Sequence, residues 1–190
     1  MPTNAPHQGG LWERAVCSAK HHLHRVIGDQ LLTYEEFVTL TTRVEAILNS
    51  RPIVPLSTDP NDLEPLTPGH FLAGGPLKSV IESNLSDIPS NRLRRWQQVQ
   101  AFSQHIWRRW QQEYLHLLQQ RSKWNTPQDN LKIGDLVIIH NSNSPRLHWK
   151  MGRISGVSPG KDGIVRVVHL KTATGNYSRP ATRVSRLPSA

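Results

Sequence analysis

Four residues near the start of the chain could act together in phosphoryl-transfer chemistry. Glu13, Cys17, Lys20 and His24 follow one another at helical intervals, so on a helix they share one face. A carboxylate can hold Mg²⁺, and a lysine two turns away can anchor a phosphate of a nucleic acid strand. Spacing by itself favours a simpler interpretation, in which a carboxylate in the first helical turn is stabilised by the helix dipole and Lys20 is solvated. Both interpretations stay open at this point.

The second group of candidate residues is cationic and lies in the second half of the chain. Residues 1–89 hold six Lys or Arg against ten Asp or Glu, a net charge of −4, whereas residues 90–190 hold 17 against four, a net charge of +13. This concentration favours nucleic acid over a membrane as partner, because cations that neutralise phosphates release condensed counterions. A basic surface that only serves solubility is the alternative. The predicted phosphate contacts are Lys150, Arg153, Arg166, Lys171, Arg179, Arg183 and Arg186.

Several other kinds of chemistry have little support in the sequence. Cys17 is the only cysteine, which excludes an internal disulfide and any zinc site that needs two thiolates. His21, His22 and His24 are more typical of a solvated helical face than of a metal site. There is no G-x-S-x-G motif of a hydrolase, no apolar run of the roughly 20 residues that span a bilayer, and no signal peptide. We therefore expect an intracellular protein.

The elements that would carry Glu13 are two amphipathic helices. Apolar residues recur at helical spacing over Leu11–Ile27, and Gly28 then provides a C-cap. Thr33 and Glu36 form a capping box at the start of a second helix, which Pro52 ends. These helices occupy residues 1–52.

Residues 53–89 are rich in proline and predict an extended connector, whose leucines are too numerous for a free linker, so part of it should pack on a neighbouring surface. No Pro or Gly occurs from Ser90 to Trp124, which predicts one long helix over residues 90–125. Its tryptophans could stack on bases, although tryptophans at helical spacing are more typical of a core.

The last segment, residues 126–190, changes to short runs of β-forming residues separated by glycine turns. The overall expectation is an α+β fold in which two helices, a connector and a long helix precede a small, basic, five-stranded SH3-like barrel. The predicted strands are Asp135–His140, Trp149–Val157, Ile164–Leu170, Asn176–Arg179 and Arg183–Leu187.

Several sequence strings resemble one family of transposable elements. The run from Pro6 to Glu13, the string Asn49-Ser50-Arg51-Pro52 and the string Leu66-Thr67-Pro68-Gly69-His70-Phe71-Leu72 resemble the integrase of Pao/BEL-type LTR retrotransposons. The region from Arg95-Trp96 through Gly134-Asp135-Leu136-Val137 to Arg179-Pro180 resembles the uncharacterised domain at the C-terminus of that integrase. The resemblance covers nearly the whole chain.

The resemblance implies a polynucleotidyl transferase with an RNase H-like core, in which two Asp and one Glu bind two Mg²⁺ ions for DNA integration. Glu13 matches that Glu, as a catalytic and metal-binding residue, and Lys20 matches a position that contacts DNA at the ends of the element. Residues 1–52 would then be the last helices of a truncated core. Proteins of this family act in the nucleus.

The sequence departs from the family pattern in one respect that bears on catalysis. In the family both Asp lie upstream of the Glu, and here only twelve residues precede Glu13. One carboxylate cannot assemble a site for two metals about 3.5–4 Å apart. We therefore expect a DNA-binding fragment without cofactor and without catalysis of its own, largely indifferent to DNA sequence. The alternatives are a transferase completed by an upstream polypeptide and a module that assembles with other integrase chains.

Overall fold

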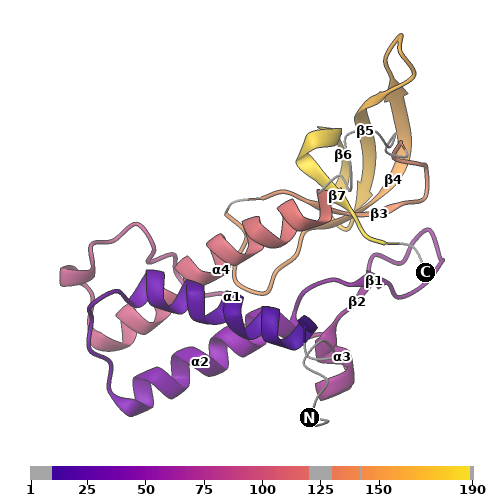
Figure 1. Ribbon diagram of the computed structural model, residues 1–190. Coiled ribbons are helices and arrows are strands. Elements are labelled where there is room, and N and C mark those ends of the chain that lie inside the picture. Colours follow the sequence, from indigo (N-terminus) through magenta and orange to yellow (C-terminus); the bar gives the residue numbers. More distant parts are fainter. Residues whose placement is uncertain (1–9, 120–129, 142, 189–190) are drawn as a thin grey trace. The chain divides into compact units, whose positions relative to one another are not determined.

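The computed structural model describes residues 10–119, 130–141 and 143–188, which form four α-helices, two short 3-10 helices and seven strands (Figure 1). The described residues divide into two compact units. The helical unit combines the chain up to Leu48 with Ile81–Trp110, and the sheet unit combines Asn49–Val80 with the chain from Gln111 onward. The predicted α+β class, with helices before a sheet, is confirmed.

Helices α1 (Gly10–Ile27) and α2 (Tyr34–Asn49) begin and end where the sequence predicts. Gly28 has a positive φ of 57°, which suits the residue that follows a helix. At the start of α2 the Thr33 N–H donates to Glu36 Oε2 at 2.9 Å, and the Glu36 N–H donates to Thr33 Oγ1 at 3.3 Å. The predicted capping box is confirmed, and it satisfies two backbone donors that the helix leaves open.

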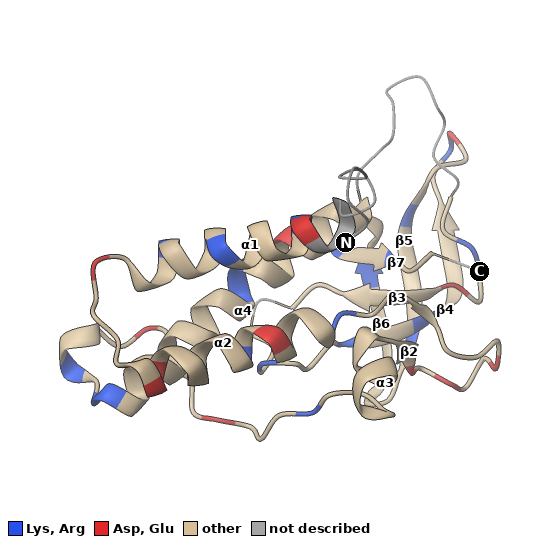
Figure 2. Cartoon of the chain, turned by 60° about the horizontal axis from the view of Figure 1, so that its bottom comes forward, with Lys and Arg blue, Asp and Glu red and all other residues tan. Residues whose placement is uncertain are grey.

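Helix α4 (Arg95–Gln119) follows the 3-10 helix η2 (Ser90–Arg92), so the predicted long helix begins five residues late. Its predicted last residues lie outside the described part of the chain. No helix among the described residues is both long enough and apolar enough to cross a membrane. The first part of α4 runs beside α2 in Figures 1 and 2. The buried apolar side chains of these two helices in the helical unit include Leu40, Val44, Ile47, Val99, Phe102 and Ile106.

Polar contacts also join α2 to α4 within the helical unit. Arg43 donates to Ser103 Oγ at 3.4 Å, forms an ion pair with Glu82 at 3.4 Å and lies over the Trp96 ring at 4.8 Å from its centroid. Ser103, which interrupts the apolar stripe of α4, is fully buried. The interruption in the hydrophobic pattern is therefore a buried polar contact.

The connector contains two short strands and a helix, which its high proline content did not predict. Strands β1 (Val54–Pro55) and β2 (Pro65–Leu66) pair antiparallel, and helix α3 (Pro68–Ala73) follows them. The Thr67 N–H at the start of α3 donates to His70 Nδ1 at 3.0 Å. A side chain at Gly69, in α3, would place its Cβ 2.8 Å from Leu77 Cγ, so this position has no room for a side chain unless Leu77 moves.

The sheet unit contains five antiparallel strands in the order β6-β5-β4-β3-β7. All five predicted strands are confirmed, with ends that differ by one or two residues. The strands are β3 (Leu136–Ile139), β4 (Met151–Pro159), β5 (Val165–Thr172), β6 (Gly175–Pro180) and β7 (Val184–Arg186). The short 3-10 helix η3 (Ala181–Arg183) joins β6 to β7.

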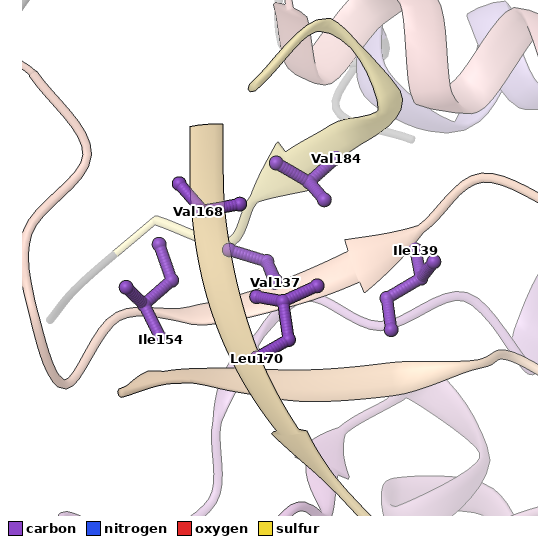
Figure 3. Packing of buried hydrophobic residues seen from close by; sticks show 6 residues of the cluster. All are labelled: Val137, Ile139, Ile154, Val168, Leu170 and Val184. Atoms are coloured by element: carbon purple, nitrogen blue, oxygen red, sulfur yellow. The ribbon is translucent and has the colours of Figure 1, made fainter. Parts of the chain in front are cut away.

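The sheet curls around one apolar cluster, as Figure 3 shows. Six buried side chains from four strands point toward one another, and β5 crosses over β3 in that view. Burying such side chains contributes about 1.5–3 kcal/mol each, before entropy is subtracted. The six residues are Val137, Ile139, Ile154, Val168, Leu170 and Val184.

The predicted barrel is an open sheet. Strands β6 and β7 are the two edges, and no hydrogen-bond ladder joins them among the described residues. The register of β4 on β5 shifts between Ile154 and Gly156 and again between Ser158 and Pro159. Such irregularities bend a strand, so they curl the sheet, but the short β7 does not reach the other edge.

The other side of β3 carries a second cluster, which the end of α4 covers. Leu115 packs there with Leu136, Ile138 and Leu187. Tyr114 lies edge-on to Trp149 at 5.7 Å between ring centroids, and its hydroxyl donates to the Pro52 carbonyl. Burial raises the pKa of Tyr114 to about 12. The aromatic pair thus ties α4, the connector and the sheet together inside one unit.

Candidate nucleic-acid interface

The sheet carries a strong excess of positive charge. Residues 130–188 hold ten Lys or Arg and only two acidic residues, Asp135 and Asp162. Figure 2 marks the cations in blue and the acids in red along the strands and turns of the sheet. An excess of this size on a small sheet attracts polyanions at long range.

Both acidic residues of the sheet already have cationic partners. Arg166 holds Asp162 through two hydrogen bonds of 2.9 and 2.7 Å, and these bonds lower the pKa of the Asp162 carboxyl. Asp135 lies 3.7 Å from Arg186 and also accepts a hydrogen bond from the Lys132 N–H. Arg166 and Arg186 are therefore partly engaged within the protein.

Tyr177 on β6 is flanked by two of these cations. Lys150 Nζ lies 4.6 Å from the centroid of the tyrosine ring, and Arg179 Cζ lies 5.7 Å from it. Tyr177 and Arg179 share one face of β6 because side chains alternate along a strand. Neither Lys150 nor Arg179 forms an ion pair with a described carboxylate. We call Lys150, Tyr177 and Arg179 the Tyr177 cluster; the aromatic ring attracts the two cations, and these cations can contact phosphate.

Arg153 has a structural role in this sheet, so its predicted phosphate contact needs correction. Its side chain is buried, and it donates to the carbonyl oxygens of Gly134 at 2.9 Å and Asp62 at 2.7 Å. A third, longer bond of 3.4 Å reaches the Ser57 carbonyl. The guanidinium thus holds the connector against the sheet, which confirms that part of the connector packs on a neighbouring surface.

Two other predicted cations, Lys171 and Arg183, remain exposed. Lys171 pairs with Arg153 across β4 and β5, and its ammonium donates to Asn61 Oδ1 at 2.8 Å, a neutral partner that leaves its charge uncompensated. Arg183 lies in η3 and lines a pocket with His140. Burial, and next the Arg183 charge, lower the pKa of His140 below its ordinary value.

Glu13 and Lys20 lie on α1 as predicted, and both are exposed. Among the described residues no group of three or more His, Cys, Asp or Glu side chains could hold a metal ion. Cys17, on the same helix, is exposed with a free thiol. Of the three carboxylates that the family resemblance implies for a metal site, the described part of the chain thus supplies only Glu13.

The tryptophans of α4 are mostly core residues. Trp107 and Trp110 are 3% and 6% exposed, which leaves no ring face for a base. Trp96 is 55% exposed, but Arg43 covers its ring at 4.8 Å. The interpretation as core applies to Trp107 and Trp110, and Tyr177 is a half-buried aromatic residue with two cationic neighbours.

Sequence reasoning missed Tyr177 and His140. A signal for Tyr177 was present, because Tyr177 and Arg179 stand two apart in a predicted strand and must share a face. No comparable signal marks His140, since its neighbours come from α4 and η3, which are distant in sequence.

Comparison with family models matched residues 94–187 to a family described as "Family of unknown function (DUF5641)". The matched segment contains the whole of α4 and the whole five-stranded sheet. No curated protein and no solved structure matched the chain. From α4 to the last strand, then, this chain is similar to a family whose function is unknown.

Proposed function

We propose that the chain binds nucleic acid through the cations of its sheet unit, largely without regard to base sequence. The observation that carries the proposal is the Tyr177 cluster, in which Lys150 and Arg179 flank an aromatic ring without a described carboxylate partner. Lys171 and Arg183 add two more exposed cations of the same unit. Contacts between such side chains and phosphates position a protein on a strand but carry no sequence information.

The proposed biological setting is DNA integration, as a fragment related to a retrotransposon integrase. Two observations support it: the motif strings span nearly the whole chain, and the family match covers the same helix and sheet that the strings assign to the integrase C-terminus. Other integrase chains and DNA are the proposed partners. Glu13, exposed on α1, is the residue through which an upstream core would complete a Mg²⁺-dependent transferase.

A direct test compares DNA binding by variants of equal charge. Lys150→Gln with Arg179→Gln removes both cations of the Tyr177 cluster, and should weaken binding of a duplex about tenfold or more at low salt, because two phosphate contacts are lost. The matched control is Arg92→Gln with Arg94→Gln, which removes two exposed cations of the helical unit. Fluorescence anisotropy measures both affinities. Equal losses in the two double variants would mean that total charge, and not this site, governs binding.

A second candidate function, assembly with another integrase chain, has its own observation. Tyr34, Phe37 and Val38 are neighbours on the surface of α2, and they are 78%, 46% and 41% exposed. An apolar patch of this kind favours a protein partner. Sedimentation over a range of concentrations tests it: we expect association that Phe37→Ser weakens, and a monomer at all concentrations would contradict it.

A further inference from the structure

A polar pocket lies within the sheet unit, and Arg183 is the one proposed phosphate contact that lines it. It has a volume of about 360 Å³ and is bounded by the end of α4, the end of β3 and η3. This volume falls within the roughly 300–1,000 Å³ typical of small-molecule sites. The pocket is therefore large enough to take a planar ring.

The residues that line the pocket are almost all hydrogen-bonding groups. They comprise four carboxamides, two imidazoles, one guanidinium and a single leucine, and none of the described lining residues is acidic. Carboxamides such as Gln112 and Asn141, together with an arginine, are the side chains that pair with the edges of nucleobases. An apolar ligand would leave these groups without partners, so the lining fits a ligand rich in donors and acceptors.

A chain of hydrogen bonds fixes which nitrogen of His140 carries the proton. Ser185 Oγ donates its one hydrogen to the Leu115 carbonyl at 3.1 Å. It must therefore accept the hydrogen bond of 2.8 Å that joins it to His140 Nε2. Nε2 then bears the proton, and in the neutral ring Nδ1 is an acceptor. Burial and the charge of Arg183 both favour that neutral ring by lowering the pKa of His140.

The backbone holds this acceptor next to a donor. The His140 N–H donates to the Arg183 carbonyl at 3.0 Å, and the adjoining residues Ile139 and Val184 are register partners of β3 and β7. The Arg183 guanidinium is exposed and forms no ion pair with a described carboxylate. The backbone thus places the residue with the imidazole acceptor and the residue with the planar donor fork next to each other in the lining of the pocket.

We propose that this pocket binds an unpaired nucleobase of the bound strand, through Arg183, His140 and the carboxamides around them. The proposal rests on the proposed function, because the base arrives as part of a nucleic acid held by the sheet. Every base presents a donor beside an acceptor on its pairing edge, and a duplex hides that edge in the base pair. The preferred ligand is therefore a single strand or a frayed end.

The test measures, by fluorescence anisotropy, the affinity of the protein for a single-stranded oligonucleotide and for its duplex, each labelled with fluorescein. Arg183→Lys keeps the charge but removes the planar fork, and should weaken binding of the single strand about tenfold while changing duplex affinity less than about twofold. The control is Arg186→Lys, an equal change in β7 at a residue that does not line the pocket, and it should leave both affinities nearly unchanged. Thermal melting of both variants checks that the fold is retained.

A second measurement addresses His140 directly. The ¹⁵N shift of its Nδ1 should move on addition of the single strand, and much less on addition of the duplex. If the protein binds both nucleic acids with equal affinity, and Arg183→Lys changes the two affinities by the same factor, the pocket proposal is wrong while the proposed function stands. If neither nucleic acid binds at low salt, both are wrong.

Discussion

The two units use their charged side chains differently. The segments 1–48 and 81–110 hold nine Lys or Arg against seven Asp or Glu, and several of these join distant elements: Arg95 pairs with Glu36 at 2.6 Å, and Arg108 lies 3.8 Å from Asp87. Residues 130–188 hold ten against two. In the helical unit, cations help to hold the fold, whereas Lys150, Lys171, Arg179 and Arg183 of the sheet unit form no ion pair with a described carboxylate. A polyanion that supplies the missing charges is the simplest explanation of that difference.

The largest expected effects come from the two separate cores. Leu40 in the helical unit and Leu170 in the sheet unit are both fully buried, so truncation of either to Ala should cost about 2–5 kcal/mol of local stability. Native-state hydrogen exchange should show faster exchange in α2 for Leu40→Ala, and in β3 to β5 for Leu170→Ala. Exchange that accelerates equally in both units for either variant would show that they form one cooperative core.

A smaller effect distinguishes a structural arginine from a binding one. Arg153→Met leaves the carbonyl oxygens of Asp62 and Gly134 without their charged donor, which should cost roughly 1–3 kcal/mol. Arg179→Met, at an exposed position, should change the free energy of unfolding by less than about 0.5 kcal/mol but weaken DNA binding. Urea denaturation measures the free energy of unfolding of both variants, and fluorescence anisotropy measures their DNA affinity. The assignment fails if Arg179→Met destabilises the protein as much as Arg153→Met does.

A helix cap offers a change confined to the helical unit. Thr33→Ala removes the hydroxyl that accepts the Glu36 N–H, and should lower stability by about 1 kcal/mol. Thr33→Ser keeps that hydroxyl and should restore most of the loss. DNA affinity should stay the same in both variants, since the sheet is untouched; a parallel fall in affinity would link the helical unit to binding.

The smallest effect is a dependence of stability on pH, with one histidine in each unit. Burial, then the nearby arginines, lower the pKa of His105, and the pKa of His140 is lowered in the same way. The unfolded chain therefore takes up protons before the folded one, so the free energy of unfolding should fall as pH drops below about 6.5. Urea midpoints at pH 7.5 and 5.5 measure this. His105→Gln or His140→Gln should flatten the dependence; a steeper fall would contradict the sign.

The elements that the sequence predicts well are those specified by local periodicity. The strand β5 alternates so regularly that Val168, Leu170 and Thr172 face the core while their neighbours are exposed. The capping box and Gly28 likewise depend on residues only a few positions apart. Local patterns of two to four residues therefore suffice to place α1, α2 and the five strands of the sheet.

Features set by contacts between distant segments were not predicted. In the sequence, Arg153 is one more cation of a basic strand. Its structural role depends on the carbonyl oxygens of Ser57 and Asp62, which are 96 and 91 residues away in the sequence. The polar pocket beside His140 also depends on segments that are distant in sequence, because α4 and η3 line it together. Closure of the sheet is also a global property, since it depends on strand length and bending at once.

The central claim is that the cations of the sheet contact phosphates. The salt dependence of DNA binding measures the number of these contacts. About four contacts, from Lys150, Lys171, Arg179 and Arg183, predict that the logarithm of the association constant for duplex DNA falls with the logarithm of salt concentration with a slope of about −3.6. The Lys150→Gln, Arg179→Gln double variant should reduce the slope to about −1.8. Absence of binding at low salt, or a slope that the double variant leaves unchanged, would contradict the claim.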